Sequence, residues 1–349
     1  MGADRAMRVI ADRAAADETA ARARWSASMS LSNAGGGSLD ERAERFASAG
    51  RLTLNFHPDR IGRHGHTVAH GLATDGEYLS QWVSGISAGS RSALPGGERQ
   101  RFEHELFAGA YDDTQPTSGV HPVYGAFDLL CDPHGGSPRF GSSYVVLREH
   151  VRERTTLCVG DSHLGPRDVG TFARPWSILA GLGEQAADHN LLNRGLDTQV
   201  LIDVLAGWSR SARPSRDLDG YVEAQIHGGV SLADDVEVIV LDPSFRGTDI
   251  ERDVAAAARR FGFDVGWHCG SELAVHDVPA DFRGPTMPAL ARAVAIDGTV
   301  HARAIGVAAA AERFDEPTPG GDAPESPRQQ LKYLWHTVVV HGTDAEPAG

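Results

Sequence analysis

The most constraining stretch of the sequence is YVEAQIHGGVSLADDVEVIVLDPSF, residues 221–245. Two short segments rich in β-branched residues flank the glycine pair Gly228 and Gly229, a pattern typical of neighbouring strands. Alternation puts the polar-capable side chains of the first segment on one face and its apolar ones on the other. One acid, Glu223, lies on the polar face. We expect it either to act chemically beside the turn or to be an exposed acid of an edge strand.

Short segments of strand character, broken by glycine turns, recur along the chain. RLTLNF at 51–56 alternates and ends before Pro58, and YLSQWVSGIS at 78–87 also resembles a strand. A strand starting near Phe140 and the segment TTLCVGDSH, 155–163, are expected to pair as a hairpin. This spacing predicts an α+β protein with a mostly antiparallel sheet rather than a series of βαβ units. The GxGxxA pattern at 181–186 has helical periodicity, which argues against a dinucleotide-binding fingerprint.

Helical patterns dominate the two ends of the chain. The N-terminal stretch lacks internal Gly and Pro over residues 3–30, and Ser38 opens a capping box for a second helix. Another amphipathic helix is expected at 249–261. We therefore expect a helical N-terminal arm at 1–48, a catalytic domain at 49–262, and a C-terminal region at 263–349 with a linker at 316–327 and a terminal helix at 328–341.

Composition excludes several classes of protein. The formal net charge of −14 and the sparse cysteines, three in 349 residues, argue against nucleic acid as a partner and against a disulfide scaffold. Lys332 is the lone lysine, which disfavours Schiff-base chemistry. We find neither a membrane-spanning run nor a signal-peptide pattern. The expectation is a cytoplasmic protein, or one exported without a cleaved signal, that does not engage membranes.

Two clusters of polar residues follow the strand expected at 51–56. His57, Asp59 and Arg60 lie where this strand runs out into a loop, a position that suits either a site or a simple polar turn. The next segment carries a histidine cluster, His64, His66 and His70, whose spacing permits a metal site but equally fits a histidine-rich loop.

Five ordered motifs resemble a bacterial family known as a domain of unknown function. They are NFHPDR at 55–60, YLSQWVSGIS at 78–87, GGSPRFGSSY at 135–144, VGDS at 159–162 and YVEAQIHG at 221–228. The same set looks distantly like the ADP-ribosyltransferases, which are NAD-consuming toxins and polymerases with a split β-sandwich. That resemblance implies a mostly antiparallel split β-sandwich in which NAD lies in a cleft between two small sheets.

The resemblance also implies site residues. In that fold a first strand contributes Arg or His, a central strand Ser or Tyr, and a late strand the catalytic Glu. Glu223 takes the late-strand position. The region of His57, Asp59 and Arg60 takes the first, and the segment Ser142, Ser143, Tyr144 the central one. The sequence lacks the STS triplet and the paired ExE of that superfamily, since Gln225 follows Glu223.

These residues suit cleavage of the nicotinamide–ribose bond. A carboxylate at Glu223 would stabilise an oxocarbenium-like ribose, and Asp59 would act as general base for the acceptor. We expect the remaining contacts to NAD from His57, Arg60, Gln81, Gly85, Ser87, Arg139, Ser142 and Tyr144, with Arg60 or Arg139 on the pyrophosphate.

The sequence thus predicts an NAD-dependent mono-ADP-ribosyltransferase, effector-like or toxin-like, that modifies a protein and needs no metal. The alternatives are a metal-dependent hydrolase using His64, His66 and His70, and a catalytically inactive module that binds a nucleotide or a protein. Stoichiometric zinc or manganese would favour the hydrolase, and NAD affinity without turnover would favour the binding module.

Overall fold

A mixed α/β fold is built around one mostly antiparallel sheet. The computed structural model describes residues 2–30, 39–62, 64–86, 93, 95–115, 119–208, 216–311 and 326–345. The strand order is β5-β4-β6-β2-β1-β3-β7-β8, and within it β7 and β8 run parallel while the other neighbours are antiparallel. The strands are β1 (Arg51–Phe56), β2 (Val123–Asp128), β3 (Ser143–Leu147), β4 (Thr155–Val159), β5 (Val169–Thr171), β6 (Val222–Ile226), β7 (Val236–Leu241) and β8 (Asp264–Trp267).

The pairing at the centre of the sheet, between β1 and β2, is short. These two strands pair only from Arg51↔Asp128 to Thr53↔Ala126, whereas β1 pairs with β3 over five residues and β2 with β6 over five. The close approach at the junction depends on Gly125, where a Cβ would lie 2.3 Å from the Thr53 carbonyl oxygen. Beyond Thr53 the two strands no longer pair, so the sheet consists of two four-stranded halves joined along a short seam.

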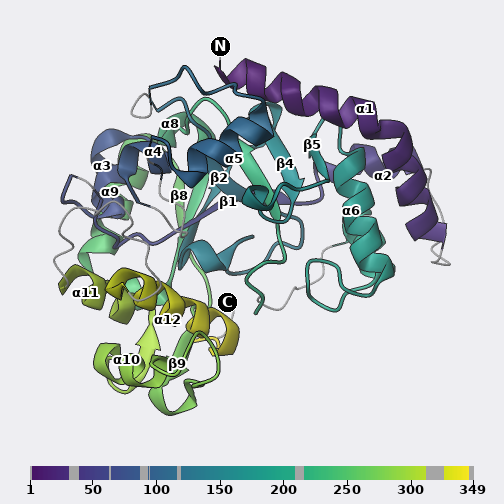
Figure 1. The fold of residues 1–349 in the computed structure, drawn as a ribbon. Coiled ribbons are helices and arrows are strands. Elements are labelled where there is room, and N and C mark those ends of the chain that lie inside the picture. Colours follow the sequence, from purple (N-terminus) through teal and green to yellow (C-terminus); the bar gives the residue numbers. More distant parts are fainter. Residues whose placement is uncertain are drawn as a thin grey trace.

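Helices surround this sheet in separate groups. Helix α1 (Gly2–Ser30) runs beside α6 (Trp176–Ala187) at the β5 end of the sheet, and α2 (Leu39–Phe46) follows it (Figure 1). Near the other end α3 (Val68–Asp75) packs against α9 (Asp249–Phe261). The remaining helices of this part are α4 (Gln81–Ser84), α5 (Glu98–Phe107), α7 (Thr198–Leu205) and α8 (Leu232–Asp235).

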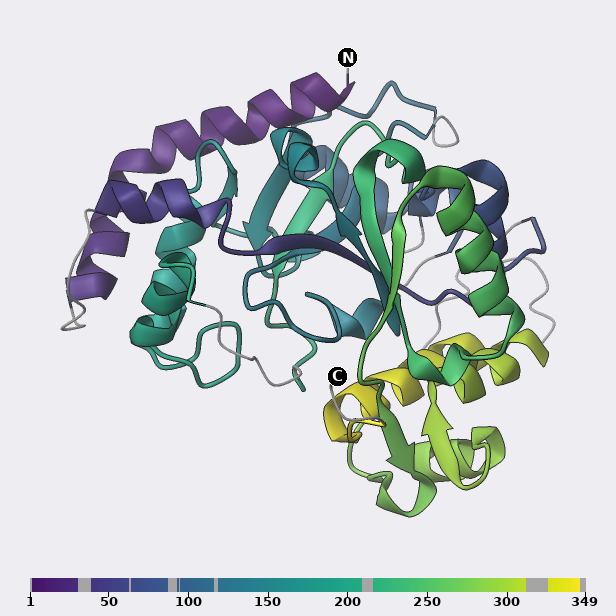
Figure 2. The same cartoon turned by 180° about the vertical axis from the view of Figure 1, so that it is seen from behind.

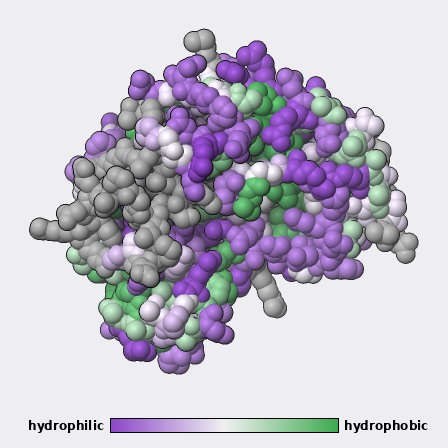
Figure 3. Space-filling model, viewed as in Figure 1, coloured by the Kyte–Doolittle hydropathy of each residue, from purple (hydrophilic) through white to green (hydrophobic). Residues whose placement is uncertain are grey.

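The C-terminal residues form a smaller lobe below the sheet, as both views show (Figures 1 and 2). It contains a two-stranded ribbon, β9 (Glu272–Ala274) with β10 (Thr299–His301), and the helices α10 (Met287–Val294), α11 (Ala302–Ala311) and α12 (Pro327–His341). The face seen in Figure 3 is mostly hydrophilic, with small hydrophobic patches, one of them on this lobe.

Several expectations from the sequence are confirmed. The helices predicted at 3–30, 249–261 and 328–341 are α1, α9 and α12, and the GxGxxA pattern lies inside α6. The sheet is mostly antiparallel, as predicted. The capping serine at 38 lies outside the described residues, as does most of the linker expected at 316–327. No helix in the described ranges has the length and apolar character needed to cross a bilayer.

Two local predictions are wrong. The described part of the segment expected as a strand, residues 78–86, is not one, because Ser80 caps the short helix α4 and Gly85 ends it with a left-handed φ of 66°. The strand β4 does not form a hairpin with β3, since it pairs with β5 and β6. In the first case a short apolar segment is buried as a helix, which local sequence does not distinguish from a strand. In the second case the strand forms as predicted, but its partners are β5 and β6.

Candidate active site

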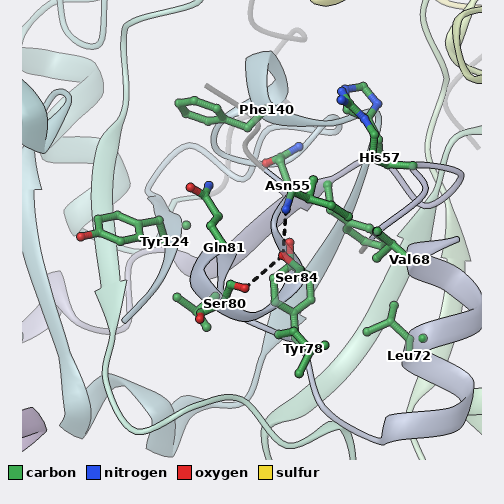
Figure 4. Close-up of a pocket in the computed structure, with 18 of the residues that line it drawn as sticks. Asn55, His57, Val68, Leu72, Tyr78, Ser80, Gln81, Ser84, Tyr124 and Phe140 are labelled. Carbon is green, nitrogen blue, oxygen red and sulfur yellow. Dashed lines mark hydrogen bonds between the residues drawn. The ribbon is translucent and has the colours of Figure 1, made fainter. Parts of the chain in front are cut away.

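A cavity of about 790 Å³ opens where β1 and β2 part. The end of β1, which pairs with β3 but no longer with β2, contributes Asn55, and the start of β2 contributes Tyr124 and Gly125. Glu223 reaches the same cavity from β6. Figure 4 shows Asn55, Gln81 and Phe140 around this space. A cavity of this size, with a few converging polar groups, is typical of a small-molecule site.

Glu223 is a buried carboxylate in an interior strand. β6 lies between β4 and β2, and only 5% of Glu223 is exposed, so it is not an edge-strand acid. Its oxygens accept hydrogen bonds from Gln225 Nε2 at 2.9 Å and from the Ser162 backbone N–H at 3.3 Å. Burial, with the charge of Asp161 as a second cause, raises the pKa of Glu223 to about 7. The group is therefore held near its titration point at neutral pH.

The predicted polar face of β6 is confirmed, and it continues as a buried hydrogen-bond chain. Thr156 donates to Gln225 Oε1 at 2.7 Å and lies 3.0 Å from His227 Nε2. The other ring nitrogen of His227 is 2.6 Å from the Tyr111 hydroxyl. Gln225 does not line the cavity, and its amide N–H orients the Glu223 carboxylate from the buried side.

Tyr124 is supported by a second buried acid, Glu103 of α5. The Tyr124 hydroxyl donates to Glu103 at 3.0 Å, as does His121 Nδ1 at 2.8 Å and the Trp82 indole N–H at 3.2 Å. In Figure 4 this hydroxyl points away from Asn55 and Gln81, so the ring and not the hydroxyl flanks the cavity. Burial and the Glu103 charge raise the pKa of Tyr124 well above its usual value. Its phenol is therefore neutral.

Gln81 and Ser80 present polar atoms that lack partners in the described chain. Gln81 Oε1 and Ser80 Oγ are buried, line the cavity, and form no hydrogen bond with any described residue. Unsatisfied buried polar atoms are costly, so such atoms in a cavity point to a ligand or to bound water. Gly85, also expected to contact NAD, ends α4. Ser87 lies outside the described residues.

His57 and Arg60 line the cavity, as predicted, whereas Asp59 does not. Burial, then the Arg60 charge, lowers the pKa of His57 to about 3, so its ring is neutral. Asp59 lies in a smaller adjoining pocket between the loop that follows β1 and the helices α11 and α12. A Cβ on Gly306 would overlap its carboxylate. The carboxylate thus packs on α11, and burial raises its pKa to about 7.

Arg139 lines the cavity, but Ser142 and Tyr144 do not. Arg139 forms an ion pair with Asp219 and donates to the Leu218 carbonyl at 3.3 Å. Ser142 and Tyr144 belong to the β3 side of the sheet, across β1 from β2 and β6. The tyrosine that reaches the cavity is Tyr124, which the motif GGSPRFGSSY does not contain.

The structure adds a carboxylate–imidazole pair that the sequence did not single out for catalysis. Asp161 Oδ1 lies 2.6 Å from His163 Nδ1, and both residues line the cavity, as does Ser162, which binds Glu223. Asp161 also caps the short turn Ser162–Leu164. Asp161 therefore both caps this turn and lines the cavity.

His64, His66 and His70 also line the cavity. The rings of His66 and His70 are 4.8 Å apart, and His70 lies 3.6 Å from Asp253. Across the described segments, converging metal-ligand atoms were found at another place, in a group formed by His134, His268 and Cys269.

The chain belongs to a protein family of unknown function, DUF3626, whose model matches residues 51–341. It is 30% identical over 177 residues to the Gene 2 protein of Mycobacterium phage L5, and 26% identical over 179 residues to the Gene 2 protein of Mycobacterium phage D29. Each match covers 49% of this chain, and 61% and 60% of the two phage proteins respectively. The chain thus spans about three fifths of the length of these curated relatives.

Proposed function

We propose that this protein is an NAD-dependent mono-ADP-ribosyltransferase that transfers ADP-ribose to a protein side chain. The observation that carries the proposal is the position of Glu223, buried on an interior strand and facing a cavity at the seam between two half-sheets. The resemblance to ADP-ribosyltransferases implies a late-strand glutamate beside a cleft between two small sheets. Glu223 supports the proposal because it lies on a late strand beside a cavity, although here the two halves belong to one sheet.

Side chains from three strands that part or run side by side at the seam meet at this cavity. Asn55 and His57 come from the end of β1, Tyr124 from β2, and Glu223 from β6. Tyr124 replaces the Ser142–Tyr144 segment as the central-strand residue. Its aromatic ring offers a flat apolar surface for the nicotinamide or ribose.

The proposed step breaks the bond between ribose C1′ and the nicotinamide nitrogen. The electron pair leaves with nicotinamide, and positive charge develops on the ribose. Glu223, when ionised, stabilises that charge, which is an interaction stronger in the transition state than in the ground state. A nucleophilic atom of the acceptor then bonds to C1′ and gives up its proton.

The Asp161–His163 pair is better placed than Asp59 to take this proton, because both its members line the cavity. Asp161 orients the imidazole through Nδ1 and leaves Nε2 as the basic atom. Arg60, Arg139 and Lys332 line other parts of the cavity wall and supply positive charge for the pyrophosphate. Gln81 Oε1, unpaired in the described chain, is suited to accept from the nicotinamide carboxamide.

The test measures nicotinamide release from NAD, and labelling of a mixed protein pool, by wild type, Glu223→Gln and Glu237→Gln. Glu237 is exposed on β7 and serves as the matched control. We expect Glu223→Gln to lower release by about 10²–10³-fold and Glu237→Gln to leave it unchanged. Equal release by wild type and Glu223→Gln would refute the proposal. NAD binding without turnover would instead identify an inactive binding module.

A further inference from the structure

A second cluster of chemically active side chains lies away from the cavity. His134, in the loop after β2, meets His268 and Cys269, which directly follow β8. All three are buried, with exposed fractions of 5%, 9% and 4%. One potential ligand atom from each lies within 4.8 Å of the other two. Two imidazoles and a thiol gathered in the interior form a donor set that transition metals favour.

The spacing of these atoms is close to that of a metal site. Cys269 Sγ and His134 Nε2 are 3.1 Å apart. Around tetrahedral zinc, with bonds of about 2.0–2.3 Å, neighbouring ligand atoms are roughly 3.5 Å apart. His134 Nε2 is also 3.0 Å from the Gly270 carbonyl oxygen. A ring nitrogen carries either one proton or one lone pair. His134 Nε2 therefore cannot form a good hydrogen bond with both Cys269 Sγ and the Gly270 carbonyl oxygen.

The backbone around the cluster orients both rings. His268 Nε2 donates to the Ser142 carbonyl at 2.7 Å, which leaves the lone pair on Nδ1. Metal-binding histidines commonly donate their second ring nitrogen to such a carbonyl. The Gly270 N–H, 2.9 Å from His268 Nδ1, now occupies that lone pair and would have to yield it to a metal. The Asn55 amide holds the His134 loop by donating to the His134 carbonyl at 2.8 Å.

We propose that His134, His268 and Cys269 bind a divalent transition metal of the zinc class. Thiolate and imidazole ligands favour zinc over magnesium or calcium. The fourth position would be filled by water or by the Gly270 carbonyl. The metal would tie the beginning of the C-terminal lobe to the loop that Asn55 holds, and Asn55 also lines the cavity. The site differs from the His64, His66 and His70 cluster and from the expectation that no metal is needed. It does not depend on the proposed enzymatic function.

The test is metal content and cobalt spectroscopy on the full-length protein. After expression with added zinc, elemental analysis should find stoichiometric zinc in wild type and in Cys131→Ser, an exposed thiol outside the cluster. Cys269→Ser and His134→Gln should lose it. Replacement by cobalt should give wild type a thiolate-to-cobalt charge-transfer band that Cys131→Ser retains and Cys269→Ser lacks. A chelator should lower the thermal midpoint of wild type and Cys131→Ser.

If the variants do not fold, wild-type protein alone still tests the metal site. Sub-stoichiometric zinc after purification, together with no thiolate–cobalt band on titration of wild type with cobalt, would overturn it. Equal metal content in Cys269→Ser and wild type would also overturn it, because the metal would then be bound elsewhere.

Discussion

Replacing Glu223 by glutamine isolates the cost of placing a charge beside the cavity. Burial, aided by the charge of Asp161, raises the pKa of this carboxyl from 4.5 to about 7. The folded protein therefore holds the proton more tightly than the unfolded chain. Stability from this group is fully present below about pH 4.5 and is lost as the pH rises through about 7.

The size of the effect follows from the two pKa values. Between pH 5 and pH 8 the linkage relation gives a loss of about 2–3 kcal/mol in the free energy of unfolding of wild type. Glutamine does not titrate, so the variant should gain this amount relative to wild type over the interval. Changes in the hydrogen bonds to Ser162 and Gln225 that do not depend on pH cancel in this difference. So does the titration of Asp59, which both proteins contain.

The assay is urea unfolding of wild type, Glu223→Gln and Glu237→Gln at pH 5 and pH 8. Glu237, exposed on β7, should follow wild type at both pH values. If wild type and Glu223→Gln lose the same stability between pH 5 and pH 8, the carboxylate is ionised without cost, and the burial argument is wrong. This outcome is independent of whether the protein turns over NAD.

Three further perturbations test other parts of the structure. Glu103→Ala removes the acceptor of three buried donors and should lower the free energy of unfolding by at least about 3 kcal/mol in urea titrations; a change below about 1 kcal/mol would contradict the network. Trp25→Ala should cost about 3–5 kcal/mol, because this fully buried ring joins α1 to α6; unchanged stability would mean that α1 is not part of the core. Asp59→Asn should leave nicotinamide release within a factor of about two, since a group outside the cavity does not stabilise the reacting charge; a loss as large as that of Glu223→Gln would restore Asp59 as the base.

The sequence predicted those parts of the fold that depend on local periodicity. Helix α1 follows from a stretch without internal Gly or Pro, and α9 from an amphipathic stretch that ends at Gly262. The polar face of β6 follows from alternation alone. The strand order has no local signal. β4 pairs with β6 across more than sixty residues of chain, and the expected hairpin with β3 failed because pairing partners are chosen by the whole sheet.

For the candidate site, sequence motifs indicated some of the residues that line the cavity and missed others. Glu223, His57, Arg60, Gln81 and Arg139 reach the cavity, and each lies in a motif whose residue types suggested chemistry. Tyr124 was missed because HPVYGAFDLL looks like any buried strand, and its meaning comes from lying beside β6. Glu103 gave no signal, because it is one of three glutamates in an exposed-looking helical sequence and its partners come from α4 and from residues 121–124.

The parting of β1 and β2 explains how one residue can be both buried and reachable. A carboxylate in the middle of a continuous sheet would be covered on its own face by packed helices and would have no room for a substrate. Here β1 and β2 stop pairing with each other after Thr53. The space between the two strand ends is the cavity that Glu223 reaches from β6. Hydrogen bonds from Gln225 and Ser162 replace part of the hydration that the carboxylate loses. The seam therefore supplies two conditions that are normally opposed, a low-polarity setting that raises the pKa of the acid and an open path for a ligand to reach it.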